Sequence, residues 1–281
     1  MLEIPTRVLV EAMVRADGTV DCGELYAVAG LLGMTDQQVR LTINRLAADG
    51  RFVQEGRGRR AVLRATVETR RTIEPTAGYI ALMYAQDRGE APWDGIWHLA
   101  GFAVPEHARP ARDALREAIT GLGGAPVQNG LYVSPHAWEE PLRAEAAALG
   151  VLGNLTLLTS RDLHTGDADD PRALARRWWP LAELAEGHER LGALAADRLA
   201  RLAAHPSDTE QLTIAIELAA AFTEALEPDP LLPPELLPQP WPGTAARALV
   251  ARCWALLLAD RRPGAPRLFD VYADVVEAVT A

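Results

Sequence analysis

Apolar residues recur at steps of three and four along the first part of the chain, which is the spacing of an amphipathic helix. The pattern predicts helices over residues 3–16, 22–32 and 36–48. Asp17-Gly18 favours a turn after the first helix. Asp21 and Thr35 can cap the second and third helices, and Gln38 completes a capping box with Thr35.

The third of these helices has two distinct faces. Val39, Ile43 and Leu46 form an inward apolar stripe. A rotation of about 100° per residue places Leu41 on the opposite side, among polar residues whose side chains can reach base edges or phosphates. The DNA contacts predicted from this helix are Gln37, Gln38, Arg40, Asn44 and Arg45, with Arg40 at the boundary between the faces.

A basic hairpin is predicted to follow the third helix. Residues 51–54 and 61–64 are short strand-like runs, with glycines at 56 and 58 in the turn between them. Arg57, Arg59 and Arg60 gather at the tip, where they can contact phosphates. The order helix, helix, turn, helix, hairpin is typical of a winged helix-turn-helix DNA-binding domain, which we assign to residues 1–85.

The middle of the chain alternates between strand and helix patterns. Strands are predicted over residues 96–104, 125–127, 130–134 and 153–159, and helices over 106–121 and 138–149. This β-α-β-β-α-β order predicts a ferredoxin-like domain at residues 93–163. Such compact domains often pair edge to edge, so we expect this one to form a homodimer.

The remainder, residues 172–281, is predicted to be an all-helical C-terminal domain, so the chain as a whole is expected to be a multidomain α+β protein. Residues 227–242 contain seven prolines and are predicted to be an extended connector. Trp178 and Trp241, with Arg176 nearby, could hold an aryl or acyl group and an anionic tail of an effector. The alternative is that these tryptophans are ordinary core residues.

The charge distribution favours a nucleic-acid partner in spite of an acidic total. The 281 residues carry a net charge of −10. From Arg40 to Arg71, however, nine arginines face three acids, a local balance of +6. No apolar run approaches the roughly 20 residues that a membrane helix needs, and no signal pattern opens the chain. We therefore expect a cytoplasmic protein without a membrane partner.

Motifs for catalysis, metal or cofactor binding are lacking in the sequence. The six histidines have no metal-ligand spacing, and Cys22 and Cys253 match no zinc or disulfide framework. We expect no enzyme activity, metal or cofactor. One alternative is a metal-dependent nuclease that uses the ferredoxin-like domain, although its first strand has no acid before Glu106. Another is a winged helix used only for protein contact, which the local charge disfavours.

Three stretches resemble the PaaX family of bacterial transcriptional repressors. They are GMTDQQVRLTINRLAADGRFVQEGRGRRAVLRAT, WDGIWHLAGFAVPE with NGLYVSP, and DPLLPPELLPQPWPG. In the first, Val39-Arg40 and Arg45-Leu46 match the recognition-helix motif and Gly58-Arg59-Arg60 the wing, whereas Val62-Leu63 stand where the family tends to have tyrosines. The resemblance implies a homodimeric repressor of a catabolic operon. It would bind double-stranded operator DNA until released by a small molecule such as an aryl- or acyl-CoA thioester.

Overall fold

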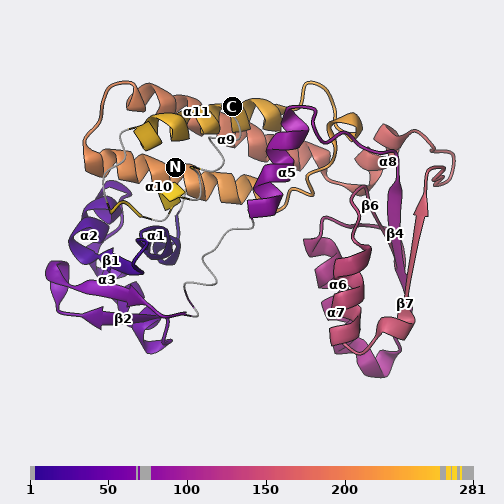
Figure 1. Cartoon of the computed structure of the whole chain (residues 1–281), viewed down its shortest axis with the longest axis horizontal. Helices are drawn as coiled ribbons and strands as arrows, with labels where there is room; N and C mark the ends of the chain where they lie inside the picture. The colour runs from indigo at the N-terminus through magenta and orange to yellow at the C-terminus, as the bar shows by residue number, and fades with distance from the viewer. Residues whose placement is uncertain are drawn as a thin grey trace. The chain divides into compact units, whose positions relative to one another are not determined.

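The structure, a computed structural model, describes residues 4–67, 69, 77–259, 264–266, 268–270 and 273. It is a mixed α+β protein with two small antiparallel sheets (Figure 1). Internal contacts divide the chain into two compact units. Unit 1 contains the described residues up to Tyr84, those of Gly187–Leu226 and those from Pro242 onward. Unit 2 contains Ala85–Glu186 and Glu227–Trp241.

The N-terminal part of unit 1 consists of three helices and a three-stranded sheet. The helices are α1 (Thr6–Ala12), α2 (Cys22–Leu31) and α3 (Asp36–Ala48). The strands are β1 (Thr19–Asp21), β2 (Phe52–Glu55) and β3 (Val62–Ala65), and a short 3-10 turn, η1 (Gly58–Arg60), joins the last two. The strand order is β1-β3-β2.

The sequence predicted most of these elements. The cap on α2 is confirmed, since the Asp21 carboxylate accepts the Glu24 N–H at 2.8 Å. Within the described residues, α1 is shorter than the predicted helix and ends at Ala12. Strand β1 was not predicted, because its three residues become a strand only by pairing with the distant β3, where Thr19 lies opposite Arg64.

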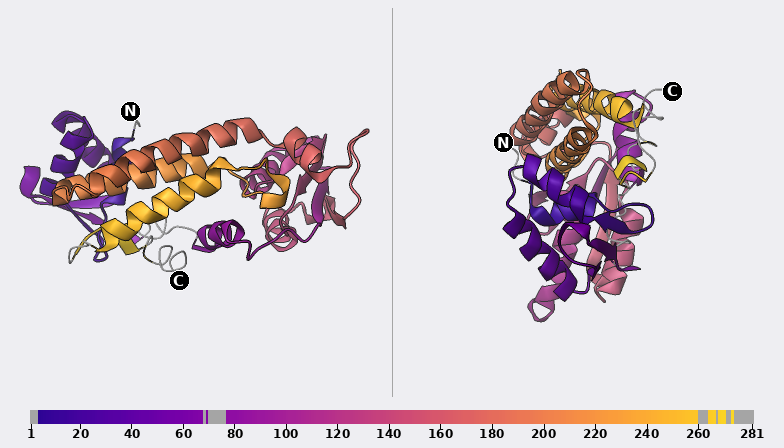
Figure 2. Two further views of the ribbon diagram at one scale, coloured as in Figure 1. Left: turned by 90° about the horizontal axis from the view of Figure 1, so that it is seen from above. Right: turned by 90° about the vertical axis from the view of Figure 1, so that its left-hand side faces the viewer.

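Further helices belong to unit 1. Two of them belong to it completely, α10 (Asp208–Leu226) and α11 (Pro242–Ala259). Two others belong to it in part: α5 (Ala77–Asp87) as far as Tyr84, and α9 (Leu181–Leu202) from Gly187 onward. In unit 1, α9, α10 and α11 run alongside one another (Figure 2). Arg198 of α9 forms an ion pair with Glu217 of α10 at 2.6 Å. The predicted cap at Pro75-Thr76 and most of the last predicted helix, 266–279, lie outside the described residues.

In unit 1 the N-terminal helices are in direct contact with the long helices from the later part of the chain. Helix α10 contacts α2 and α1, so the first two N-terminal helices pack on a helix that comes much later in the sequence. The face of α10 that is buried in unit 1 is almost entirely apolar, with Leu212, Ile214, Ile216, Leu218 and Phe222.

Unit 2 is built on a four-stranded antiparallel sheet with the order β5-β6-β4-β7. Its strands are β4 (Trp97–Phe102), β5 (Ala125–Gln128), β6 (Leu131–Ser134) and β7 (Leu155–Ser160). Its helices are α6 (Arg109–Gly121), α7 (Glu139–Ala148) and α8 (Pro171–Trp178), with short turns η2 (Glu106–Ala108), η3 (Leu152–Asn154) and η4 (Pro234–Leu236). Helices α6 and α7 lie side by side on one face of the sheet (Figure 1). The predicted β-α-β-β-α-β order is present.

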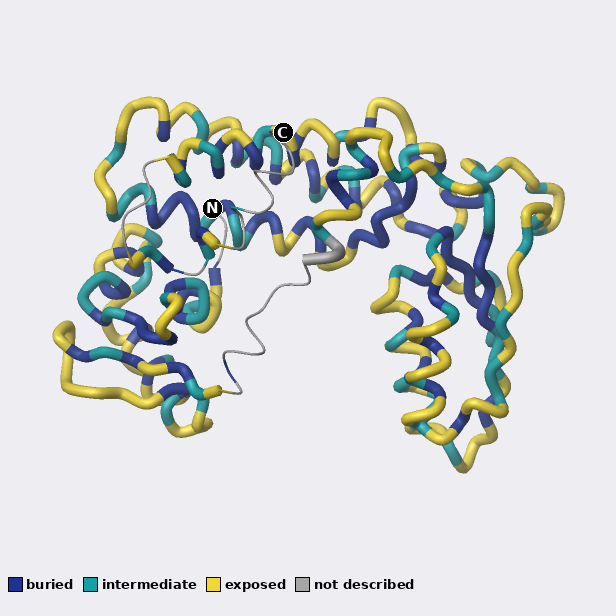
Figure 3. The backbone as a smooth tube through the Cα atoms, in the orientation of Figure 1, coloured by how far each residue is buried: buried dark blue, intermediate teal, exposed yellow. Residues whose placement is uncertain are grey.

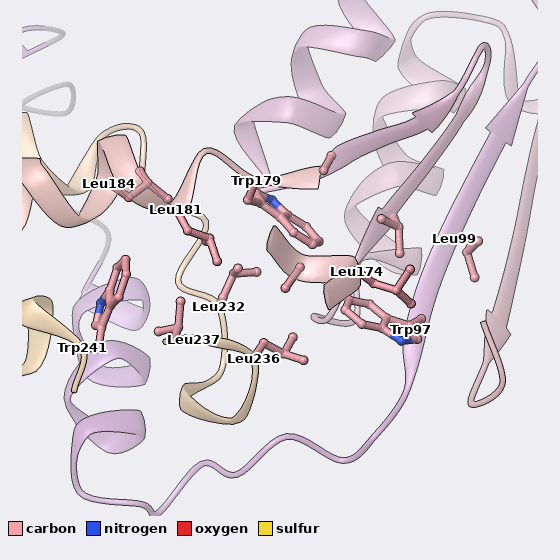
Figure 4. Close-up of a cluster of buried hydrophobic side chains, with 13 residues drawn as sticks. Trp97, Leu99, Leu174, Trp179, Leu181, Leu184, Leu232, Leu236, Leu237 and Trp241 are labelled. Carbon is pink, nitrogen blue, oxygen red and sulfur yellow. The ribbon is translucent and has the colours of Figure 1, made fainter. Parts of the chain in front are cut away.

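The two faces of this sheet bury two different cores, because successive side chains of a strand point in opposite directions. On the α6 and α7 face, Ala100 of β4 packs with Leu115, Ile119 and Trp138. On the other face, Leu99 belongs to a cluster with α8 and the proline-rich segment. That segment is extended around η4, and it is also a buried part of the core, to which it contributes Leu232, Leu236, Leu237 and Trp241 (Figure 4). Leu231 of the same segment is buried as well.

Candidate nucleic-acid interface

Helix α3 presents one polar face to solvent. Its start is fixed by the predicted capping box, which is confirmed: the Gln38 N–H donates to Thr35 Oγ1 at 3.2 Å, and the Thr35 N–H donates to Gln38 Oε1 at 2.8 Å. The predicted inward residues, Val39, Ile43 and Leu46, are all buried. The helix is therefore anchored by its apolar side, and its opposite side is available to a partner.

The residues predicted to contact DNA from α3 are all exposed; they are Gln37, Gln38, Arg40, Asn44 and Arg45. In Gln38 the amide oxygen is already used by the capping box, which leaves its NH₂ group free to donate. Leu41 lies among these residues with 58% of its surface exposed. It was not predicted as a contact, although its place on the outward face was visible in the sequence.

The hairpin between β2 and β3 brings a second exposed set of arginines to the same unit. Arg57, Arg59 and Arg60 are all exposed, and the turn that carries them is exposed throughout (Figure 3). Gly56 and Gly58 have φ of +87° and +62°, a backbone conformation that glycine adopts without strain. These glycines let the chain turn tightly enough for the three arginines to stand together.

The arginines of this region divide into paired and unpaired groups. Among the described residues, ion pairs join Arg51 to Glu11 at 3.0 Å, Arg64 to Glu55 at 3.1 Å and Arg59 to Asp36 at 3.0 Å. No such pair is formed within the described part of the chain by Arg40, Arg45, Arg57 or Arg60. With respect to the described residues, the donors of these four guanidinium groups can therefore serve an external anion.

The residues predicted to bind an effector lie in unit 2 but have different surroundings. Trp178 packs against the cluster with Trp97 at a ring-centroid distance of 5.6 Å, and Trp241 is buried in the same cluster. Arg176 is exposed and lies 4.0 Å from Asp170. The buried Nε1–H of Trp178 has no hydrogen-bond acceptor among the described residues. The tryptophans thus have a clear packing role, and their role in effector binding stays a prediction.

A histidine pair lies beside the proline-rich segment of unit 2. His98 Nδ1 is 2.6 Å from Glu139 Oε1, and His136 Nε2 is 2.8 Å from the Leu231 carbonyl oxygen. Burial acts to raise the pKa of Glu139, but hydrogen bonds, that of His98 foremost, outweigh it and lower the pKa. The pKa of His136 is lowered mainly by burial. Since a carbonyl oxygen can only accept, His136 Nε2–H donates to Leu231 and links this segment to the loop after β6.

The cysteines have no reactive environment. Burial raises the pKa of both Cys22 and Cys253 to about 11, which keeps each thiol protonated. Within the described residues, no group of three or more histidines, cysteines and acids is arranged to hold a metal ion. None of the described helices has the length and apolar character needed to cross a membrane.

Comparison with protein families identifies most of the chain. Residues 90–174 match the model of the PaaX protein central Cas2-like domain, and residues 179–262 match that of the PaaX-like protein C-terminal domain. The protein belongs to the PaaX family, whose members are transcriptional regulators. The resemblance seen in the sequence is thereby confirmed.

Comparisons with individual proteins add little detail. No curated protein sequence matches this chain. Among solved structures, the uncharacterized protein Rv0674 from Mycobacterium tuberculosis is similar over 98% of this chain and 96% of its own, with 21% sequence identity and a TM-score of 0.49.

Proposed function

We propose that this protein is a DNA-binding transcriptional repressor that reads its operator with a winged helix-turn-helix. Three helices followed by a β1-β3-β2 sheet support this assignment. In that fold α3 would be the recognition helix, and the hairpin of β2 and β3 would be the wing. The observation that carries the proposal is the placement of Arg40 and Arg45 on α3 and Arg57 and Arg60 on the hairpin, all exposed and without ion pairs among the described residues.

Each exposed group has a distinct proposed role. Gln37 and Asn44 contact base edges in the major groove, where amide side chains pair best with adenine. Arg40 and Arg45 reach guanine edges or phosphates, and Arg57 and Arg60 contact the flanking backbone. Gln38 and Arg59 were also predicted as contacts. Because the Gln38 amide oxygen and Arg59 Nη2 are engaged within the protein, we give these two side chains a secondary part in the interface.

Selection from random DNA tests this function. Full-length protein is mixed with a library of duplexes with a randomised core, and bound duplexes are recovered and sequenced. We expect recovery of a roughly palindromic motif, with half-sites about one helical turn or a multiple apart, because a symmetric dimer presents two recognition helices. Recovery of no enriched sequence over repeated rounds would contradict operator recognition.

We also propose that unit 2 contains a ferredoxin-like domain that forms the homodimer. The sheet order β5-β6-β4-β7 and the helices α6 and α7 support the assignment. Strand β7 pairs only with β4 among the described strands, and its Leu158 is 46% exposed. Light scattering on Leu158→Arg should show loss of dimer, since a charge at this edge opposes association. Leu122→Arg, at the exposed end of α6, is the control and should remain a dimer.

The effector is proposed to be an aryl- or acyl-CoA thioester that binds near Trp178. The Nε1–H of Trp178, buried without an acceptor among the described residues, could donate to a carbonyl oxygen of such a ligand. The exposed Arg176 could pair with an anionic tail. A thermal-shift screen with acyl-CoA thioesters, repeated on Trp178→Phe, tests this site. A stabilising thioester that protects both proteins equally would place the site elsewhere.

A further inference from the structure

The guanidinium of Arg59 has two partners inside the N-terminal part of unit 1. Its Nη2 donates to both oxygens of Asp36, at 3.2 Å and 3.0 Å. Its carbon Cζ lies 5.2 Å from the centroid of the Tyr26 ring, within the range of a cation–π interaction. Asp36 is the first residue of α3 and Tyr26 belongs to α2. One side chain from the turn therefore contacts both helices of the helix-turn-helix.

The backbone that carries Arg59 is also docked. The Cys22 N–H donates to the Ala61 carbonyl oxygen at 3.1 Å. A Cβ atom added at Gly23 would lie 3.1 Å from the Arg59 carbonyl oxygen, so the turn passes close to the start of α2. Arg57 precedes this docked stretch, and neither it nor Arg60 has an ion pair within the described residues. The three arginines of the tip are thus not equivalent.

The negative charge of Asp36 gives the ion pair with Arg59 a role in DNA binding. In helix-turn-helix proteins the N-terminal end of the recognition helix approaches the DNA. A free carboxylate at that end would repel the phosphates. The Arg59 guanidinium cancels this charge, and in doing so it uses donors that a phosphate would otherwise take.

We propose that Arg59 is a positioning residue that neutralises Asp36 and holds the turn against α2 and α3, while Arg57 and Arg60 supply the direct phosphate contacts of the tip. The proposal rests on the proposed DNA-binding function. It predicts that the Asp36–Arg59 pair can be replaced as a unit without loss of a phosphate contact, although Arg59 alone cannot be replaced.

Salt dependence of DNA binding separates the two kinds of arginine. Fluorescence anisotropy would be measured with full-length protein and a labelled duplex selected by the wild-type chain, over a series of salt concentrations. The variants are Arg59→Gln, the neutral pair Asp36→Asn with Arg59→Gln, and Arg57→Gln as the matched control. Thermal melting of each variant confirms that it is folded.

The neutral pair is expected to bind within about twofold of wild type with an unchanged slope of log affinity against log salt, since no phosphate contact is lost. Arg59→Gln alone should weaken binding by about threefold or more, because the uncovered Asp36 carboxylate then repels the DNA. Arg57→Gln should reduce the magnitude of the slope by about 0.9, as expected for one lost phosphate contact.

Two results would overturn the proposal. A neutral pair whose slope falls as much as that of Arg57→Gln would mean that Arg59 itself contacts a phosphate. An Arg59→Gln variant that binds like wild type would mean that Asp36 needs no neutralisation. In both cases wild type and the Arg57→Gln control still behave as expected, so the DNA-binding function stands. If wild type selects and binds no duplex, the function itself fails.

Discussion

Gly124, at the junction of α6 and β5, is the position where one added methyl group should do most harm to unit 2. A Cβ atom there would lie 2.4 Å from Cζ3 of Trp138, 2.7 Å from the Ile119 carbonyl oxygen and 2.8 Å from Ile119 Cγ2. Trp138 is 2% exposed and Ile119 is fully buried, so neither can move outward. The Ile119 oxygen also belongs to the backbone of α6, and it accepts the Gly124 N–H at 3.0 Å.

Gly124→Ala is therefore expected to destabilise unit 2 by about 2–3 kcal/mol, the upper part of the range for overpacked sites. For a domain of roughly a hundred residues, each kcal/mol corresponds to about 4–5 °C in melting temperature, which gives a decrease of about 8–15 °C. Gly121→Ala is the control. A Cβ atom added at Gly121 would meet no described atom within 4 Å apart from its chain neighbours and the nearby backbone of α6, so the melting temperature of this variant should be unchanged or slightly raised.

Tryptophan fluorescence during thermal melting is the natural assay, because six of the seven tryptophans belong to unit 2. The transition of the tryptophan signal then reports mainly on this unit. A Gly124→Ala protein that melts within about 2 °C of wild type would refute the argument from overpacking. It would mean that the backbone near the end of α6 adjusts at little cost.

Three further outcomes are expected. In the folded protein the pKa values of His136 and Glu139 both lie below their ordinary values, so the unfolded chain binds protons more readily. The melting temperature followed by tryptophan fluorescence should therefore fall as the pH drops below about 6.5, and it should fall less in His136→Gln. Glu217→Gln leaves Arg198, 16% exposed, without its charged partner on α10 and should cost about 2 kcal/mol in urea unfolding followed by circular dichroism. Replacing a thymine next to Leu41 by uracil in a selected duplex should weaken the binding of wild type about fivefold. The same replacement should leave the binding of Leu41→Ala unchanged.

Local patterns explain what the sequence could predict. The capping box of Thr35 and Gln38 and the inward stripe of α3 depend on neighbours three or four residues apart, and both are present. The β-α-β-β-α-β order was also visible, since each strand and helix has its own periodicity. Family membership followed from short motifs in their order along the chain.

Features that depend on distant residues were beyond the sequence. Strand β1 exists because Val20 pairs with Leu63 of β3, and the ion pair of Arg59 with Asp36 joins residues 23 positions apart. Trp178 contacts Trp97 of β4, so its packing in a core could not be derived from the spacing of C-terminal residues alone. Likewise, the prolines of residues 227–242 indicated an extended segment but not that its leucines are buried in unit 2.

The central claim is that α3 reads DNA, and the affinity of Arg45→Ala for a selected duplex tests it most directly. Arg143→Ala, an exposed arginine on α7 of unit 2, is the matched control. We expect Arg45→Ala to bind the selected duplex about 5- to 150-fold more weakly than wild type, as for a lost base or phosphate contact of about 1–3 kcal/mol, and Arg143→Ala to bind like wild type. Equal affinity of Arg45→Ala and wild type would contradict the assignment of α3 as the recognition helix.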